Sequence, residues 1–570
     1  MNLDSILDNN RYSHAIILII ACYISFFIFN SEFFVNIMEA RNFVTAREMI
    51  DKGNWLVPTM NGELRLAKPP LPTWITALFG MWFGMENLSL LRFPAGIMGS
   101  LMVLFMYLFT ISLNGDKNKA LINSLILTTS FYVLYMSRTG TWDIYCHSFM
   151  LGAIWLFHKA WTRDSKSYIL FIAIGLLLGL SFLSKGPVAF FAMLIPFVIA
   201  YSWIYGGKII LQKWQPLLLS VIIFIIVSFW WPIYIAIAHA PEAAAVAKLE
   251  SGSWMNRHVR PFFYYWNFPI QSGIWTMAIF TSLLVPYALK NFKAIKEYKF
   301  ALIWPVSSVI LLSLIPEKKD RYLLPVLIPS AILAGQFFHH LYLVFKENNS
   351  KKIDRILFGI NIWLIAIVAF ALPIVVFLMF HQQKLMSIQT FALFSIFAEL
   401  IFVILIVCWI NKNIRGMLIG MTTLMLVVLV FIIPHTGGVL NKNPKFKSIS
   451  EVSNNAKINS LNYYSIGEKA FRIELVYEIG KDITAWDSKM NPAFPENKPF
   501  VVMSSEDPND LFSEAQKNQM NLTIIDHFDN NKQRAGKRRN KEHFKKYVSL
   551  ITPLNNSEAK SSTSIISSNK

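Results

Sequence analysis

Long runs of apolar residues recur along the chain from Ile16 to Pro434, and few charges interrupt them. A soluble enzyme places charged residues on one face of each helix, because only the other face meets its core. A run of about 20 apolar residues instead has the length of a membrane-spanning helix. The pattern predicts about thirteen spans, at residues 15–34, 90–113, 120–136, 143–161, 168–183, 188–204, 216–238, 273–289, 301–315, 322–345, 356–380, 388–410 and 416–434.

Composition and charge support this topology. Charged residues make up 15% of the 570, against about 25% in soluble domains. The net charge of +19 comes from basic connections in alternate loops, at 117–119, 159–166, 208–213, 290–299, 346–355 and 412–415. Cytoplasmic loops carry such an excess, so a membrane lipid, and no nucleic acid, is the expected partner. We expect a cytoplasmic N-terminus and a tail outside the cytoplasmic (inner) membrane.

The pattern predicts two domains. Residues 1–434 form an all-α, multi-pass membrane domain with outward loops at 31–89 and 239–272. Residues 435–570 form an extracytoplasmic, soluble α/β domain, because polar stretches alternate there with strand-like runs. The last ten or so residues, rich in Ser and Asn, are typical of disorder. The strand-like runs are 461–466, 471–479, 500–503, 522–525 and 547–551.

The first outward loop begins with a pattern typical of an amphipathic helix. Phe43, Ala46 and Ile50 share one face, and Gly53 follows as a terminator. We expect this helix to lie flat on the outer membrane face. Glu39, at its start, either faces water or points into a site.

Further outward polar residues lie where a membrane protein has a reason to keep them. Lys68 precedes Pro69-Pro70 and either binds a phosphate as a point charge or reaches the lipid head groups. Asp143 begins a span, where a carboxylate indicates function, caps the helix, or does both.

Basic residues in two other outward turns oppose the general charge trend. Lys185 lies before Gly186-Pro187, and Lys318 and Lys319 follow a proline between two spans. A lipid-linked phosphate would supply the missing anionic partner. Alternatively, the two neighbouring lysines pair with the adjacent Glu317 and Asp320.

The sequence contains no Walker loop, no Rossmann glycine fingerprint and no zinc-ligand spacing. We therefore expect no metal and no cofactor. Outward carboxylates beside outward cations favour transfer of a group from a lipid phosphate to an external acceptor. A transporter of lipid-linked sugar is a rival hypothesis, but the inverted repeats and broken helices typical of transporters are not evident in the sequence.

A set of short motifs runs through the outward segments. They are Glu39-Ala40-Arg41, Gly53-Asn54-Trp55, Asn61-Gly62, Lys68-Pro69-Pro70-Leu71, the turn from Arg138 to Asp143, Ser184-Lys185-Gly186-Pro187, His258 with Pro261-Phe262-Phe263-Tyr264, and Lys319 with Arg321-Tyr322-Leu323-Leu324-Pro325. Together they resemble the bacterial protein-O-mannosyltransferase-like membrane glycosyltransferases, and among these the lipid A aminoarabinose transferase type.

The resemblance implies a GT-C fold and an inverting glycosyltransferase that uses a polyprenyl-phosphate sugar as donor. The implied acceptor is lipid A or a related glycolipid, with a protein as the alternative. The implied catalytic residues are Glu39 and Asp143. The implied donor- or phosphate-binding residues are Arg41, Lys68, Arg138, Lys185, Lys319, Arg321 and Tyr322, and the acceptor or cavity residues are Trp74, His258 and Tyr264.

One position departs from the family pattern. The first loop of the family usually begins Asp-Glu, whereas this chain has Met38 before Glu39. A general base must lie within hydrogen-bond reach of the hydroxyl that it activates. Either Glu39 takes that role, or Asp143 carries it, or the protein has lost the activity although the surrounding motif is complete.

Overall fold

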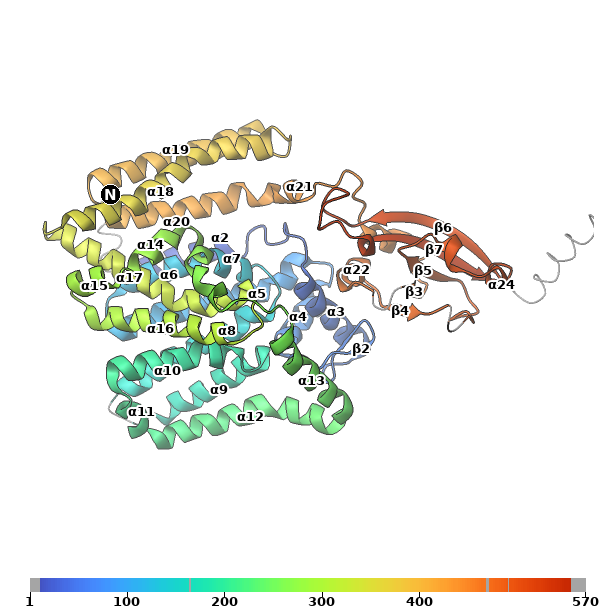
Figure 1. Ribbon diagram of the computed structural model, residues 1–570, viewed down its shortest axis with the longest axis horizontal. Helices are drawn as coiled ribbons and strands as arrows, with labels where there is room; N and C mark the ends of the chain where they lie inside the picture. The colour runs from blue at the N-terminus through green and yellow to red at the C-terminus, as the bar shows by residue number, and fades with distance from the viewer. Residues whose placement is uncertain (1–10, 164–165, 468–470, 489, 491, 555–570) are drawn as a thin grey trace, which may run out of the picture. The chain divides into compact units, whose positions relative to one another are not determined.

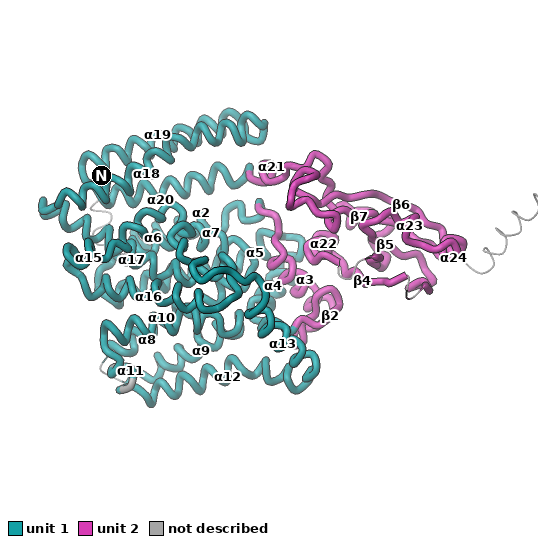
Figure 2. Tube along the Cα trace, in the orientation of Figure 1, with its two compact units in different colours: residues 1–32, 66–435 teal, residues 33–65, 436–570 magenta. Residues whose placement is uncertain are grey.

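The computed structural model describes residues 11–163, 166–467, 471–488, 490 and 492–554 (Figure 1). The chain forms two compact units, and each is built from separate stretches of sequence (Figure 2). Unit 1 comprises residues 1–32 and 66–435, and unit 2 comprises residues 33–65 and 436–570. The sequence-based boundaries placed residues 31–89 in the membrane domain, whereas the structure groups 33–65 with the tail. The predicted disorder at the end of the tail concerns residues outside the described part.

Unit 1 is a bundle of helices. Its α-helices are α2 (Arg11–Phe26), α4 (Leu71–Phe83), α5 (Leu88–Asn114), α6 (Lys117–Thr128), α7 (Phe131–Ser137), α8 (Trp142–Thr162), α9 (Tyr168–Lys185), α10 (Ile195–Tyr201), α11 (Lys208–Gln212), α12 (Trp214–Ala238), α13 (Ala240–Asn256), α14 (Thr276–Ser282), α15 (Val285–Asn291), α16 (Ile295–Leu314), α17 (Leu324–Lys346), α18 (Lys352–Val376), α19 (Ile388–Ile410) and α20 (Ile414–Phe431). The remaining turns are 3₁₀ or π: η1 (Phe190–Leu194), η2 (Ser202–Gly206), η3 (Phe262–Trp275), η4 (Asp320–Leu323), η5 (Phe377–His381) and η6 (Ile433–His435).

Eight helices of the described residues are long and apolar enough to cross a membrane, and two bent pairs raise the number to ten. The multi-pass helical class is confirmed, but the predicted count of about thirteen spans is not. The predicted spans 120–136 and 273–289 are bent pairs, each with an angle of 68°. The predicted spans 15–34 and 188–204 are shorter apolar helices. Span 143–161 is α8, whose polar side chains lower its mean hydropathy.

Helix α17 contains the most buried apolar stretch of the eight candidate spans. Its most apolar stretch is 89% buried, whereas that of α12 is 17% buried. Helices α6, α14 and α16 pack around α17 (Figure 1). A helix that is apolar on all sides is typical of such an interior. Because neighbouring helices surround α17, its N-terminal end has a fixed position.

Unit 2 contains a five-stranded mixed sheet with strand order β4-β3-β5-β7-β6. Strands β4, β3 and β5 are parallel, and β7 pairs antiparallel with both β5 and β6. The elements are α3 (Ile37–Lys52), β1 (Thr59–Met60), β2 (Glu63–Leu64), α21 (Thr436–Leu440), η7 (Ile449–Asn454), β3 (Tyr463–Ile466), α22 (Ile473–Ile479), β4 (Ile483–Trp486), β5 (Phe500–Ser504), α23 (Pro508–Leu511), α24 (Glu514–Lys517), β6 (Met520–Asp529), η8 (Glu542–Phe544) and β7 (Lys545–Pro553).

Helix α3 belongs to the core of unit 2. Ala40 and Val44 are fully buried in one apolar cluster with Val476 and Ile479 of α22. Protein side chains therefore cover the apolar residues that were expected to meet lipid, and the position of this helix on the outer membrane face stays a prediction. The predicted strand at 471–479 is also wrong: its apolar residues recur at helical spacing, and Gly480 ends the helix at φ 76°.

Candidate active site

Asp143 and Lys185 form a buried ion pair at the ends of two neighbouring helices. Asp143 lies in the first turn of α8, and Lys185 is the last residue of α9. Their exposed fractions are 1% and 7%, and the Lys185 Nζ donates a hydrogen bond to the Asp143 carboxylate. A helix N-terminus favours an anion and a C-terminus favours a cation, so both helix dipoles stabilise this pair.

The sequence around Lys185 fixes the end of α9. Gly186 has φ 76° and ψ −152°, a conformation that residues with a Cβ rarely adopt. Pro187 follows and cannot continue the helix because it lacks an N–H group. The ammonium group of Lys185 is thereby held at the helix end.

Three cations surround the ring of Tyr322. The Nζ atoms of Lys185 and Lys319 lie 5.4 and 5.7 Å from the ring centroid, and the Cζ atom of Arg321 lies 5.7 Å from it. Arg321 also interacts electrostatically with Asp143, and its buried Nε atom has no hydrogen-bond partner. A buried N–H without a partner is costly, and an anionic ligand would satisfy it.

Glu317 holds Lys319 and Tyr322 in place. The Lys319 Nζ lies 2.5 Å from its Oε1, and the Tyr322 hydroxyl lies 3.3 Å from its Oε2. Burial lowers the pKa of the Lys319 ammonium, while the hydrogen bond to Glu317 opposes this. Tyr265 accepts a hydrogen bond from the Lys319 backbone N–H at 2.9 Å. Lysine pairing with an adjacent acid is confirmed for Lys319.

The segment after α13 pairs with the segment after α16 through their backbones. Val259 and Glu317 form an antiparallel bridge, and the His258 carbonyl accepts the Lys318 N–H at 3.2 Å. His258 has φ 50°, and its side chain is exposed. Tyr264, just beyond this segment, donates a hydrogen bond to Asp320 at 2.6 Å. His258 and Tyr264 therefore flank the turn that carries the cations.

Three predicted residues of unit 1 have other partners. Lys68 pairs with Glu250 of α13 at 3.0 Å. Trp74 stacks on Trp230 of α12, with ring centroids 5.9 Å apart. Arg138 donates hydrogen bonds to the carbonyls at the end of α2, including that of Ser25 at 2.6 Å. A substrate role for each of these residues stays a prediction.

Glu39 and Arg41 lie in unit 2, on α3. The Glu39 carboxylate accepts hydrogen bonds from the backbone N–H and the amide of Asn36, at 3.2 and 2.7 Å. These bonds complete a capping box at the start of α3. The catalytic role implied for Glu39, and the donor-binding role implied for Arg41, stay predictions.

Sequence reasoning missed several residues around Asp143. Tyr132 lies within electrostatic range of Asp143 and Arg321. His147 is fully buried one turn after Asp143, and its Nδ1 atom has no hydrogen-bond partner. His147 could have been predicted, because residues four apart in a helix lie on the same face and His147 is four residues after Asp143. Tyr265 and Tyr132 could not have been predicted in this way, because aromatic residues are frequent throughout this chain.

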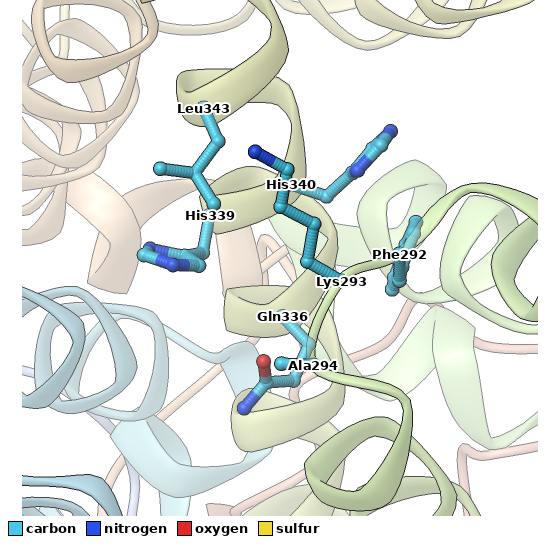
Figure 3. A pocket seen from close by; sticks show the side chains of 7 residues that line it. All are labelled: Phe292, Lys293, Ala294, Gln336, His339, His340 and Leu343. Atoms are coloured by element: carbon cyan, nitrogen blue, oxygen red, sulfur yellow. The ribbon is translucent and has the colours of Figure 1, made fainter.

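A cavity with several polar side chains in its lining lies further along α17 (Figure 3). It has a volume of about 260 Å³ and is lined by Phe292, Lys293, Ala294, Gln336, His339, His340 and Leu343. Two of its polar side chains already have partners within the protein: Lys293 pairs with Glu347 at 2.7 Å, and His340 contacts Asp354 at 3.2 Å. Its histidines lie 18 or more residues along the helix from Arg321, about 27 Å by helix rise. This cavity is therefore separate from the cation cluster.

Comparisons with known proteins show which proteins this chain is similar to. The family model described as dolichyl-phosphate-mannose-protein mannosyltransferase matches residues 67–232. An uncharacterized protein of Aquifex aeolicus (strain VF5) is 28% identical over 296 residues, covering 52% of this chain and 58% of that protein. The undecaprenyl phosphate-alpha-4-amino-4-deoxy-L-arabinose arabinosyl transferase of Enterobacter sp. (strain 638) is 29% identical over 322 residues, covering 52% and 54%. The chain thus matches little more than half the length of these relatives.

The solved structure of ArnT from Cupriavidus metallidurans bound to undecaprenyl phosphate is similar over 95% of this chain and 98% of its own, with a TM-score of 0.64 and 14% identity. The chain has the GT-C fold of ArnT. The resemblance that the motifs indicated is confirmed. The family model includes Asp143 and Lys185 but ends before the turn with Lys319 and Arg321, which lies within unit 1 of this ArnT-like fold.

Proposed function

We propose that this protein is an inverting glycosyltransferase of the cytoplasmic membrane. It moves a sugar from a polyprenyl-phosphate donor to lipid A or a related glycolipid at the outer face. The names of the arabinosyl transferase relatives and the undecaprenyl phosphate in the ArnT structure support this donor class. The proposal includes the finer topology expected from the sequence: about thirteen spans, an N-terminus inside and the α/β domain of unit 2 outside.

The observation that carries the proposal is the buried Asp143 carboxylate beside three cations. Lys185, Lys319 and Arg321 all contact the ring of Tyr322, and together they exceed the charge of Asp143 and Glu317. The excess is one positive charge, so a phosphodiester with one negative charge would balance the cluster and pair with the Arg321 guanidinium. The phosphate of a polyprenyl-phosphate sugar is such a diester, and the released polyprenyl phosphate gains a second negative charge that the same cations would stabilise.

The proposed reaction begins when Lys185 exchanges Asp143 for the donor phosphate as its anionic partner. When the donor phosphate draws Lys185 toward itself, the Asp143 carboxylate is free to accept a proton from the acceptor hydroxyl. The acceptor oxygen bonds to the anomeric carbon, and the bond between that carbon and the phosphate oxygen breaks. Polyprenyl phosphate leaves with the electron pair, stabilised by the cations. Glu39 is the second carboxylate that the family resemblance implies.

The test is the mass spectrum of lipid A from the source organism with and without this gene. We expect a sugar-sized mass increment that disappears on deletion and returns with the wild-type gene. Complementation with Asp143→Asn is expected not to restore it, whereas Asp526→Asn, a matched change at a surface pair with Lys447 in unit 2, is expected to restore it. Immunoblots of the membranes control for the amount of each variant.

Protein O-glycosylation is the second candidate, because the matching family model is described as a protein mannosyltransferase. It shares the donor chemistry and the Asp143 cluster, and it differs only in the acceptor. An unchanged lipid A spectrum together with loss of glycan from envelope proteins on deletion would replace the lipid acceptor by a protein.

A further inference from the structure

Helices α2 and α5 enclose an elongated cavity of about 840 Å³. Two contacts join its walls directly: the His14 Nδ1 lies 3.0 Å from the Tyr107 hydroxyl, and the rings of Phe27 and Phe93 lie 4.7 Å apart. The walls are mostly apolar and include Leu18, Ile19, Cys22, Ile97, Leu101 and Leu104.

The dimensions of the cavity suit a hydrocarbon chain. Its lining runs along α5 from Ile97 to Ile111, a helix rise of about 21 Å. One leaflet contributes about 15 Å, half of the 30 Å hydrocarbon core. The volume falls within the range of about 300–1,000 Å³ typical of ligand sites. Ile19 and Leu104 on the rim are 67% and 46% exposed, so the cavity opens sideways toward the bilayer.

A single cation lies at one end of the cavity lining. Lys117, at the start of α6, lines the cavity and is partly buried, and it forms no ion pair with any described residue. Lys119 by contrast pairs with Glu297 at 3.1 Å. The adjacent Asp116 carboxylate accepts backbone N–H bonds from Asn118 and Lys119 at 2.8 and 3.1 Å. Lys117 therefore has an ammonium group available for an external anion.

We infer that this cavity binds one acyl chain of an anionic glycerophospholipid, whose phosphate pairs with Lys117. The second acyl chain remains in the bilayer beside the open rim. The charge pattern places the Lys117 loop on the cytoplasmic side, where anionic lipids attract Lys and Arg. The site is distinct from the Asp143 cluster, and it stands whether or not the proposed glycosyl transfer is correct.

Native mass spectrometry of the full chain in mild detergent tests the inference. Phosphatidylglycerol and phosphatidylethanolamine are added in turn, and the fraction of protein that retains one lipid is measured. We expect phosphatidylglycerol to be retained preferentially. Lys117→Gln is expected to reduce its retention about fivefold. Leu104→Trp, which fills the cavity, is expected to reduce retention of both lipids at least tenfold.

Matched variants separate the cavity from the general lipid-facing surface. Leu218→Trp, on α12 and 52% exposed, is expected to retain lipid as the wild type does. Ile97→Trp fills the same cavity from another position and serves if Leu104→Trp does not fold. Wild-type retention in a folded cavity-filling variant would overturn the inference. An unchanged lipid preference in Lys117→Gln, or a co-purified polyprenyl phosphate that the cavity-filling variants lose, would also overturn it.

Discussion

Two buried carboxylates, Glu48 in unit 2 and Asp143 in unit 1, are each 1% exposed but are satisfied in different ways. Glu48 accepts hydrogen bonds from the Thr59 hydroxyl at 2.5 Å, from the Gly62 N–H at 3.3 Å and from the Asn61 N–H, in addition to one from the Lys52 ammonium at 3.3 Å. The hydrogen bond that Asp143 accepts from a described residue comes from the ammonium of Lys185. Backbone donors cannot leave without unfolding the hairpin, whereas a lysine can exchange one anion for another.

The comparison teaches that burial alone does not identify a reactive carboxylate. Glu48 fixes the β1–β2 hairpin to α3, and the Asn61 amide then exchanges two hydrogen bonds of 2.8 Å with the backbone of Ile483. These bonds extend the edge of β4, so the Glu48 carboxylate has a structural role. Asp143 has a replaceable partner and two further cations nearby, and it is therefore the group suited to chemistry.

The largest expected effect concerns Asp143. Asp143→Asn removes the proposed general base while keeping the size of the side chain, so the rate of sugar transfer should fall about 10²- to 10⁴-fold. The rate is measured with purified protein and a polyprenyl-phosphate sugar. Asp510→Asn, on the short helix α23 of unit 2, is the control and should keep the wild-type rate.

A smaller effect is expected for Arg321, the cation proposed to bind the donor phosphate. Arg321→Gln removes a charged donor, and hydrogen bonds to charged groups contribute about 1.5–3 kcal/mol. The KM for the donor should therefore rise about 10- to 100-fold, with a smaller change in kcat. Lys318→Gln is the control, because the Lys318 Nζ bonds to the Ile315 carbonyl at 2.6 Å. Equal effects of both variants would refute a specific role for Arg321.

In unit 2, Glu48→Ala should weaken the hairpin without a direct effect on chemistry. The backbone donors of Asn61 and Gly62 lose their acceptor, which costs about 2 kcal/mol. Amide hydrogen exchange at residues 59–64 should accelerate about 30-fold. Glu63→Ala, an exposed change on the same hairpin, should leave exchange within about twofold, since such surface changes are usually within ±0.5 kcal/mol.

The smallest expected effect concerns the surface pair of Lys52 and Asp482. Burial raises the pKa of Asp482, but hydrogen bonding and charge from Lys52 outweigh it and lower the pKa overall. A carboxyl with a lowered folded pKa stabilises the protein above its unfolded pKa of about 3.9. This stabilisation disappears as the pH falls through the folded pKa.

Because both side chains are about one-third exposed, with fractions of 37% and 34%, the pair is worth only about 0.2–1 kcal/mol. Asp482→Asn should therefore accelerate exchange at residues 483–486 less than about fivefold at pH 7, and the difference from wild type should shrink below the unfolded pKa and vanish below the folded pKa. A difference that persists there would show that Asp482 acts through packing.

The sequence predicted which cations lie together better than it predicted the path of the chain. Lys185, Lys319 and Arg321 were singled out because cations on the outward side of a membrane need an anionic partner, and the structure brings them together around Tyr322. Their role in donor binding stays a prediction. The burial of α3 was missed because its apolar residues look the same whether lipid or protein covers them. The bends within 120–136 and 273–289 were missed because hydropathy reports apolar length and not direction.

The partner exchange at Asp143 is tested most directly by measuring donor binding and sugar transfer in the same variant. In Asp143→Asn, Lys185 loses its anionic partner and becomes available to phosphate. The account predicts that a polyprenyl-phosphate sugar binds at least as tightly as to wild type, while transfer falls at least 100-fold. Loss of binding in parallel with loss of transfer, in a variant that folds normally, would contradict it and make the Asp143–Lys185 pair a structural element.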